Sequence, residues 1–414
     1  MINLRYFLHR LQDVKVYDLI QVFPMIVALV ATPFCKNKYK DVWLICEEPK
    51  EARDNGYWFF RYMVENHSEQ KCIYAIDKKS VDYANVKNLG KVIQYGSIKH
   101  WIVYFSAKHT ISSQKGGKPN AALCAFIELN GLYNSHMIFL QHGITINNVR
   151  WLYADRSKIE LFITAAKPEY KYILDNFGYT PDTICLTGFP RFDGLHDYTI
   201  KENRILIMPT WRSWFTEKSS MQGELNDNFM NSSYLLGWKK LLEHPILNSL
   251  IEKYKLEIIF YPHRNMQFLI EDFKRNIKTK AIIASWEKYD IQELMKSSEM
   301  MITDYSSVFF DMVYMKKPVV FYQFDVEDFR KAHYSEGYFN YFDNPFGKSY
   351  VTPKEVLQRI EYYVNRGFKI DESAENAHKA FFKYCDSKNS ERIYNLIKQR
   401  EIFEYKKEYT SRIL

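Results

Sequence analysis

Several patterns that define common kinds of site are absent from this sequence. The six cysteines are scattered and form no C-x-x-C pair, so we expect reduced thiols rather than a disulfide framework or a cysteine zinc site. The histidines show no metal-ligand spacing, and no Asp-x-Asp cluster stands at the end of a predicted strand. The stretch SSQKGGKP (residues 112–119) is rich in glycine but does not match the P-loop pattern. We interpret it as a flexible loop of the first lobe that faces the acceptor.

A strong excess of charge of either sign is absent as well. The 414 residues include 57 basic and 49 acidic side chains, a formal net charge of +8. This modest balance favours acidic partners such as anionic lipids or phosphorylated substrates, and we expect no nucleic-acid partner. Hydrophobic residues make up 47% and aromatic residues 17% of the chain, enough to build the cores of two or three domains.

The apolar stretch VYDLIQVFPMIVALVATPF (residues 16–34) is a poor membrane span. It contains Asp18 and two prolines, and it lacks the small-residue cleavage site of a secretory signal. Basic residues flank it on both sides, as in helices that lie in the interface of an anionic membrane; they are Arg5, Arg10, Lys15, Lys36, Lys38 and Lys40. We expect residues 1–40 to form an amphipathic, membrane-proximal segment. The alternative is a helix packed on the protein's own core.

Short apolar runs alternate with helical patterns through the rest of the chain, as is typical of doubly wound parallel sheets. In the first half, strands are predicted within residues 41–48, 71–77, 90–97, 108–114, 136–143 and 161–166, with a helix over 56–67. The pattern restarts near residue 200. Further strands are predicted within residues 203–214, 256–265 and 281–287 and at 300–303 and 319–322, followed by a helical tail from about Glu375.

The expected fold class is therefore α/β, with two Rossmann-like lobes and a cleft between them where the chemistry lies. We assign residues 41–198 to the first lobe and residues 199–395 to the second. Residues 396–414 are expected to form a C-terminal helix that packs back or stays exposed.

The stretch MITDYSSVFFDMVYMKKPVVFY (residues 301–322) predicts a phosphate site. Its hydroxyl-rich turn stands between a strand and a helix predicted over residues 308–315, at the edge where parallel sheets bind ligands. Hydroxyl groups here can donate hydrogen bonds to phosphate oxygens, and those residues are Thr303, Ser306 and Ser307. Asp304 can cap the helix, or accept from a ribose hydroxyl or from His263. Asp311, one turn into the helix, is expected on a solvated face.

Two histidines follow apolar strands and are candidates for acid–base chemistry. His142 comes after residues 137–140, and Gly143 allows a sharp turn there. A neutral imidazole in this place can take a proton from a hydroxyl; the alternative is a histidine that only bonds to backbone. His263 stands beside Arg264, a pair suited to neutralising a phosphoryl group and its leaving group. Arg212 ends a further strand, where neighbouring tryptophans either shelter it or fill the core.

Five motifs occur in a familiar order, namely GFPRFDGL, PTWR, YPHRN, ITDYSSVFFDMVYMKKPVVFY and DSKNSERI. Together they resemble the CDP-glycerol glycerophosphotransferase family, which contains teichoic-acid primases and polymerases and related capsule enzymes. The resemblance covers roughly residues 136–395. It implies a GT-B-like fold whose final helix crosses back to the first lobe.

The reaction that this resemblance implies is transfer of glycerol phosphate from CDP-glycerol to a hydroxyl of a lipid-linked or growing cell-surface polymer, with release of CMP. His142, with Gly143 on the acceptor side, corresponds to the family's base, and His263 to its second histidine. The donor phosphates would be held by His263, Arg212, Arg264, Thr303, Asp304, Ser306 and Ser307. No metal is required, and Mg²⁺ is an optional aid.

The expected partners are CDP-glycerol or CDP-ribitol, a polyprenyl-linked or polymeric glycan, and an anionic membrane surface at the cytoplasmic face of a bacterial cell membrane. The sequence LQHGITINN departs from the Trp-His-Gly-Thr-Pro form of the teichoic-acid enzymes and is closer to capsule-type relatives. Four other interpretations stay open: a ribitol phosphate transferase, a GT-B glycosyltransferase, a UDP-sugar 2-epimerase and a non-catalytic assembly component. Fold analogy alone does not decide among them.

Overall fold

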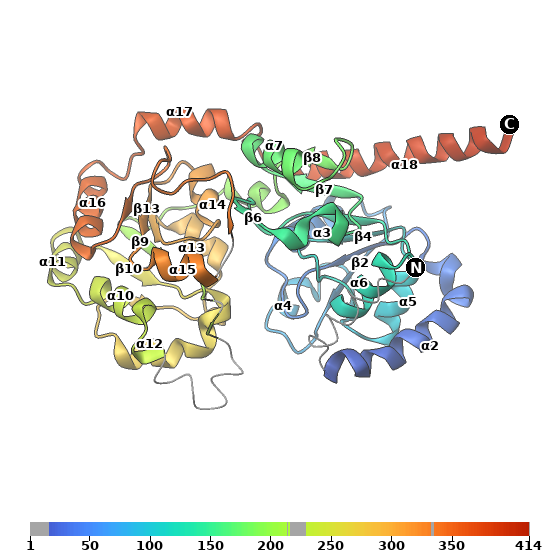
Figure 1. The fold of residues 1–414 in the computed structure, drawn as a ribbon, viewed down its shortest axis with the longest axis horizontal. Coiled ribbons are helices and arrows are strands. Elements are labelled where there is room, and N and C mark those ends of the chain that lie inside the picture. Colours follow the sequence, from blue (N-terminus) through green and yellow to red (C-terminus); the bar gives the residue numbers. More distant parts are fainter. Residues whose placement is uncertain (1–15, 213, 216–228, 333–334, 414) are drawn as a thin grey trace. The chain divides into compact units, whose positions relative to one another are not determined.

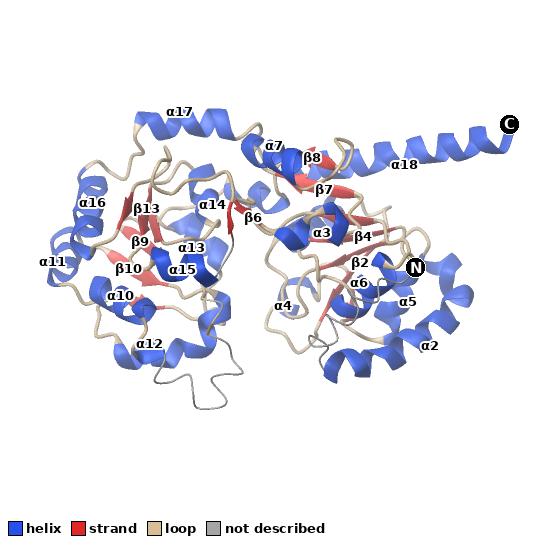
Figure 2. Cartoon of the chain, viewed as in Figure 1, coloured by secondary structure: helices blue, strands red, loops and turns tan. Residues whose placement is uncertain are grey.

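The computed structural model describes residues 16–212, 214–215, 229–332 and 335–413, and the chain divides into two compact units. The first unit comprises Met1–His142, Arg150–His196 and Lys383–Leu414, and the second comprises Gly143–Val149 and Asp197–Phe382. Each unit is built on one large parallel sheet with helices around it (Figures 1 and 2). The expected boundary at residues 198 and 199 lies two residues from the observed division at 196 and 197.

The first unit contains a seven-stranded sheet in the order β3-β2-β1-β4-β5-β7-β8, and all its strand pairs are parallel. The strands are β1 (Trp43–Cys46), β2 (Cys72–Ile76), β3 (Lys91–Gln94), β4 (His109–Ser112), β5 (Met137–Phe139), β7 (Leu161–Thr164) and β8 (Ile184–Leu186). The helices are α2 (Val16–Tyr39), α3 (Asn55–Asn66), α4 (Tyr83–Val86), α5 (Ile98–Ser106), α6 (Ala121–Leu129), α7 (Lys167–Asn176) and α18 (Asn389–Ile413), with short 3-10 turns η2 (Arg150–Leu152), η3 (Ala154–Arg156) and η4 (Pro190–Leu195).

The central strands of this sheet, β1, β4, β5 and β7, are buried along their length. Every side chain of β1 is at most 2% exposed, and β4 and β7 are buried at every position. Continuous apolar runs are typical of parallel strands covered on both faces. All six strands predicted in this half of the chain are confirmed, and burial accounts for the central ones, whereas β3 is partly exposed.

Helix α2 runs through the apolar stretch and includes Pro24 and Pro33 in its interior. Within the described residues it is the one helix long and apolar enough to cross a membrane. It packs along α5, as Figure 1 shows in dark blue beside cyan. The basic residues predicted to precede it, Arg5, Arg10 and Lys15, lie outside the described residues.

The second unit contains a six-stranded parallel sheet in the order β11-β10-β9-β12-β13-β15 and a small antiparallel pair, β14-β6. Its strands are β6 (Asn147–Asn148), β9 (Arg204–Met208), β10 (Glu257–Phe260), β11 (Ile282–Ile283), β12 (Met300–Thr303), β13 (Val319–Tyr322), β14 (Ser335–Glu336) and β15 (Ser349–Tyr350). Its helices are α10 (Ser233–Leu242), α11 (Pro245–Tyr254), α12 (Ile270–Asn276), α13 (Ile291–Ser297), α14 (Phe309–Tyr314), α15 (Val326–Ala332), α16 (Pro353–Asn365) and α17 (Glu372–Phe381), with the 3-10 turn η5 (Arg264–Leu269).

Helix α18 begins against η4 of the first unit. Asp193 accepts hydrogen bonds from the backbone N–H groups of Asn389 at 2.7 Å and Ser390 at 2.9 Å. Further along the helix, Glu401 Oε1 lies 3.1 Å from Nε2 of His109. Residues 383–395, which the sequence pattern assigned to the second lobe, therefore belong with the first unit.

Candidate functional site

In the first unit, the loop that carries His142 follows β5 and is held by Asn55 at the start of α3. Asn55 is fully buried, and its Nδ2 donates to the carbonyl oxygens of Leu140 at 3.4 Å and Gln141 at 2.5 Å. Gln141 turns the chain with a φ of 60°, a left-handed conformation that costs a residue with a side chain about 1 kcal/mol. The Gln141 side-chain oxygen accepts from the His142 N–H at 3.1 Å. These hydrogen bonds fix the loop and leave the imidazole exposed.

Arg191, in the GFPRFDGL motif, completes this clamp, and sequence reasoning gave it no role. Its side chain is buried. Its Nη1 donates to the His142 carbonyl oxygen at 2.9 Å and lies 3.0 Å from Oδ1 of Asp54. Its backbone N–H donates to Oδ1 of Asn55 at 3.0 Å. The motif was visible in the sequence, but its contact with His142 exists only in the folded unit.

The electrostatic surroundings of His142 favour a neutral ring. Desolvation and the positive charge of Arg191 both lower the pKa of His142 below its ordinary value. The imidazole itself reaches solvent, and the direction of the shift is the one that Arg191 imposes by its charge alone. A histidine that is neutral at physiological pH can accept a proton from a hydroxyl.

The chain bends at His142 and Gly143, as predicted, but the left-handed residue at this bend is Gln141 rather than the glycine. Gly143 has no left-handed φ. Glycine at this position lets the backbone pass close to Ser307. A Cβ atom on residue 143 would lie 3.1 Å from Oγ of Ser307. Gly143 and Ser307 both belong to the second unit.

The short arm that follows, residues 143–149, is fastened to the second unit at two further points. Its strand β6 pairs antiparallel with β14. A Cβ atom at Gly337 would lie 2.2 Å from the carbonyl oxygen of Ile146, so only glycine fits beside the arm at that position. This antiparallel pair was not predicted, because two-residue strands leave too short a pattern in the sequence.

In the second unit, the predicted donor residues lie at the carboxyl ends of three neighbouring strands. Strands β10, β9 and β12 are adjacent and parallel. His263 and Arg264 follow β10, Arg212 follows β9, and residues 304–307 follow β12. Because the carboxyl ends of parallel strands share one edge of a sheet, the fold brings these loops together.

Arg212 and Asp304 are fully buried and pair with each other at this edge. Arg212 Nη2 lies 2.9 Å from Oδ2 of Asp304 and 2.9 Å from Oδ2 of Asp325. Asp304 Oδ1 accepts from the backbone N–H groups of Thr210 and Tyr305, each at 2.7 Å. The partners that the structure shows for Asp304, two backbone N–H groups and an arginine, differ from those expected from the sequence, which were the helix start, a ribose hydroxyl and His263. We therefore assign Arg212 and Asp304 to holding the loop rather than touching phosphate.

The three hydroxyl residues of the loop differ in exposure. Thr303 is fully buried, and its Oγ1 donates to the carbonyl oxygen of Met208 at 2.6 Å. Ser306 and Ser307 are half-buried, and Ser306 Oγ accepts from the Val308 N–H at 3.3 Å. The two serines are thus the hydroxyl groups of this loop that a ligand can reach.

His263 and Arg264 are half-buried side chains at the same edge. Nδ1 of His263 accepts from the Asn265 N–H at 3.1 Å, which places the proton of a neutral ring on Nε2. The guanidinium carbon of Arg264 lies 3.9 Å from the ring centroid of Trp286, so the aromatic ring orients the cation. His263 can therefore present an N–H group, and Arg264 a charge, to an anion.

Two other expectations are wrong. Asp311 is fully buried rather than solvated, because all six residues of α14 are buried. The glycine-rich segment 112–119 is tied down at both of its lysines rather than flexible: Lys115 Nζ donates to the carbonyl oxygen of Trp151 at 2.7 Å, and buried Lys118 pairs with Glu128 at 2.5 Å.

Within the part of the chain that the structure describes, no group of three or more His, Cys, Asp or Glu side chains is placed to hold a metal ion.

The model of the CDP-glycerol:poly(glycerophosphate) glycerophosphotransferase family matches residues 28–399, and the chain belongs to this family. Among its relatives, the minor teichoic acid biosynthesis protein GgaB of Bacillus subtilis (strain 168) is 34% identical over 364 residues, which cover 86% of this chain and 40% of GgaB. The teichoic acid poly(glycerol phosphate) polymerase of the same strain is 23% identical over 400 residues, covering 85% of this chain and 48% of the polymerase. The chain thus spans less than half the length of these two relatives.

Solved structures show the same fold. A structure of the wall teichoic acid polymerase TagF has a TM-score of 0.64 at 19% identity and covers 95% of this chain and 100% of its own. A putative UDP-N-acetylglucosamine 2-epimerase from Listeria monocytogenes has a TM-score of 0.55 at 15% identity, covering 87% and 96%. The two-sheet α/β architecture is therefore GT-B-like, and at these identities the likeness concerns the fold alone.

A double-mutant cycle tests the approach of Gly143 to Ser307. Gly143→Ala should push Ser307 Oγ out of place, because the new Cβ atom would lie 3.1 Å from it, closer than an ordinary contact. If Ser307 binds donor phosphate, donor affinity measured by calorimetry falls severalfold. In a Ser307→Ala background the same glycine substitution should change donor affinity less than about twofold, since the clash is gone. An equal loss in both backgrounds would contradict this account of Gly143.

Proposed function

We propose that this chain transfers glycerol phosphate from CDP-glycerol to a hydroxyl group of a lipid-linked or growing teichoic-acid or capsule polymer. The family match over residues 28–399 carries the proposal, and the names of GgaB and of the poly(glycerol phosphate) polymerase agree with it. One TagF structure was obtained after a soak with CDPG. In the proposed step the acceptor oxygen bonds to the β-phosphorus, the bond from that phosphorus to the bridging oxygen breaks, and CMP leaves with that oxygen.

His142 is the proposed base that removes the proton from the acceptor hydroxyl. The hydrogen bonds of Asn55 and Arg191 hold its backbone, and its ring is exposed and neutral. A fixed position and a correct protonation state are the two requirements for a general base.

The donor diphosphate is the proposed ligand of His263, Arg264, Ser306 and Ser307. Phosphoryl transfer depends mainly on positioning and on stabilising charge, so these donors matter as much as the base. Removing one such donor typically costs about 10²-fold in rate. Arg212, Thr303 and Asp304 act indirectly, by fixing the loop that carries the serines.

Ribitol phosphate is the second candidate for the transferred group. A teichoic acid poly(ribitol-phosphate) polymerase of Bacillus spizizenii is 25% identical over 250 residues, 55% of this chain. Release of CMP, measured by chromatography from CDP-glycerol and from CDP-ribitol with isolated bacterial membranes as acceptor, separates the two. Faster release from CDP-glycerol is expected. Release from CDP-ribitol alone would replace glycerol by ribitol, and release from neither would contradict the proposal.

The pH dependence of transfer should report the unusual state of His142. Because the pKa of His142 is lowered below its ordinary value of about 6.5, the base is neutral at physiological pH, and kcat/KM should fall only on acidification below pH 6.5. Arg191→Gln removes the neighbouring positive charge, raises the pKa towards the ordinary value of about 6.5, and should move the acid limb to higher pH. Arg191→Lys keeps the charge and should keep the limb in place. An unmoved limb in Arg191→Gln would argue against His142 as the titrating base.

The same chain is proposed to lie on an anionic membrane through α2. Two polar side chains in the first half of this helix face the first unit: Gln21 Oε1 accepts from Trp101 Nε1 at 2.9 Å, and Asp18 Oδ1 accepts from Asn120 Nδ2 at 2.7 Å. Its exposed apolar side chains are 48–88% accessible, and they are Val16, Tyr17, Leu19, Ile20, Phe23, Ile26, Leu29, Val30 and Phe34.

This arrangement is the reverse of an ordinary surface helix, whose polar face meets water. The hydrogen bonds of Asp18 and Gln21 hold α2 along the unit, which favours a helix lying in the interface over one that crosses the bilayer. Lys36, Lys38 and Lys40 come after these apolar residues in the sequence, and their positive charges complement an anionic membrane surface.

Vesicle co-sedimentation tests the attachment. The double variant Phe23→Ser/Val30→Ser should lower vesicle binding by more than tenfold, because each side chain contributes about 1.5–3 kcal/mol when buried. The matched control Val81→Ser/Leu132→Ser removes two other exposed apolar side chains of the same unit and should bind as the unsubstituted chain does. Unchanged vesicle binding together with loss of a dimer in light scattering would assign the α2 face to a second copy of the chain.

A further inference from the structure

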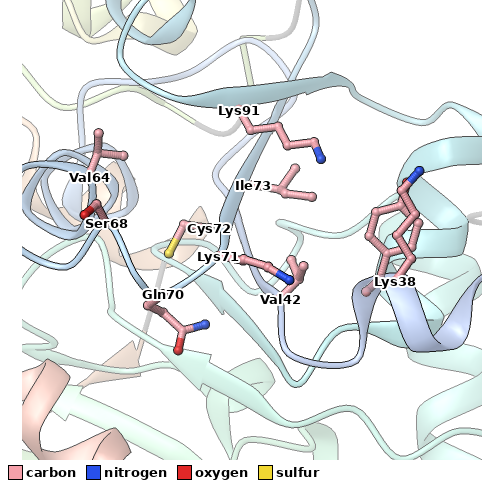
Figure 3. Close-up of a pocket in the computed structure, with 10 residues that line it drawn as sticks. Lys38, Val42, Val64, Ser68, Gln70, Lys71, Cys72, Ile73 and Lys91 are labelled. Atoms are coloured by element: carbon pink, nitrogen blue, oxygen red, sulfur yellow. The ribbon is translucent and has the colours of Figure 1, made fainter.

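A pocket of about 460 Å³ lies in the first unit, at the last turn of α2 and the amino ends of β1, β2 and β3 (Figure 3). Lys38 and Tyr39 come from the end of α2, Val42 precedes β1, Lys71 precedes β2, and Lys91 begins β3. His142 follows the carboxyl end of a strand in the same sheet. The pocket therefore lies at the opposite edge of this sheet from the proposed base, and the reaction does not use it.

The lining combines cations with an apolar floor. Tyr39, Val42 and Ile73 are buried, and Figure 3 shows the lysines around Val42 and Ile73. Lys38, Lys71 and Lys91 are exposed. Within the described residues none of the three takes part in an ion pair with a carboxylate. Three unpaired ammonium groups above apolar side chains suit a ligand with an anionic group and a hydrocarbon part.

The pocket adjoins the apolar face of α2, because Lys38 stands four residues, about one helical turn, after the exposed Phe34. A helix in the membrane interface lies at the boundary between head groups and acyl chains. If α2 lies in the interface, the last turn of α2 places Lys38 at the depth of the lipid phosphates.

We propose that this pocket binds the phosphate group of an anionic phospholipid whose acyl chains lie along α2. The inference rests on the proposed membrane attachment and goes beyond it, since it assigns a specific head-group site rather than a diffuse charge. Basic pockets beside membrane helices bind anionic head groups in this way. The apolar floor favours a lipid over free phosphate.

Co-sedimentation of the full chain with two kinds of vesicle separates this site from the α2 anchor. One vesicle contains phosphatidylcholine alone, and the other contains phosphatidylcholine with phosphatidylglycerol. The test variant is Lys71→Gln/Lys91→Gln. The control Lys167→Gln/Lys171→Gln makes the same charge change on two exposed lysines of α7, which packs on β8 at the far edge of the sheet. Thermal unfolding should be alike in all three proteins.

The test variant should lose about 25-fold in binding to the phosphatidylglycerol vesicles, about fivefold per lysine, and keep its binding to phosphatidylcholine. The control should lose less than about twofold. Equal losses in both variants, or none, would overturn the head-group site. Displacement of the unsubstituted chain from phosphatidylglycerol vesicles by inorganic phosphate at constant ionic strength would assign the pocket to free phosphate. Binding of the unsubstituted chain to neither vesicle would instead overturn the attachment through α2.

Discussion

Replacing His142 by alanine should lower transfer by about 10²- to 10⁴-fold, the usual contribution of a general base, while CDP-glycerol binding changes less than about twofold. The imidazole belongs to the first unit, and the proposed donor ligands belong to the second. Loss of the ring therefore removes the base without removing a phosphate ligand. CMP release measures the first quantity, and titration calorimetry measures the second.

His136→Ala is the matched control for this variant. His136 stands at the other end of β5, is exposed, and pairs with Glu160 at 2.9 Å, so its loss should leave transfer unchanged. Weak donor binding in His142→Ala would place His142 with the donor ligands instead. Normal transfer in that variant would remove the assigned base altogether.

Arg212→Met should destabilise the second unit by about 3–5 kcal/mol, the usual cost of removing one partner from a buried ion pair. Asp304 and Asp325 would both be left buried without their cation. The guanidinium also lies 4.7 Å from the ring centroid of Tyr234, so its packing is lost as well. Urea unfolding followed by fluorescence measures the effect.

Arg264→Met provides the contrast on the same unit. Arg264 is half-buried against Trp286, and its loss should cost less than about 1 kcal/mol in stability but should weaken donor binding. If Arg212→Met instead keeps its unfolding free energy but binds the donor weakly, Arg212 is a phosphate ligand and does not hold the loop.

The elements that could be predicted from the sequence are those with strong local patterns. Strands β12 and β13 have the predicted bounds, Met300–Thr303 and Val319–Tyr322, and α14 lies within the predicted helix. The placement of His142 and His263 after strands followed from the same apolar runs. Local pattern is sufficient where a parallel strand is buried on both faces.

The parts that could not be predicted depend on contacts between distant segments. Arg191 meets the His142 carbonyl group 49 residues away in the chain. The GFPRFDGL and DSKNSERI motifs were visible, but their mutual contact was not: Asp193 binds the start of α18, and a Cβ atom at Gly188 would lie 1.9 Å from Oδ1 of Asn389. Arg212 and Arg264 both follow strands, but Arg212 is fully buried and Arg264 is half-buried. The degree of burial could not be predicted from the residue type.

The central claim is that the second unit binds a CDP-alditol, and titration calorimetry of the purified chain tests it without knowledge of the acceptor. The ligands to compare are CDP-glycerol, CDP-ribitol, CMP and UDP-N-acetylglucosamine. The account predicts selective binding of CDP-glycerol, weakened by His263→Ala and unaffected by His142→Ala. Binding of UDP-N-acetylglucosamine alone would contradict the account and favour a glycosyltransferase or an epimerase on the same fold.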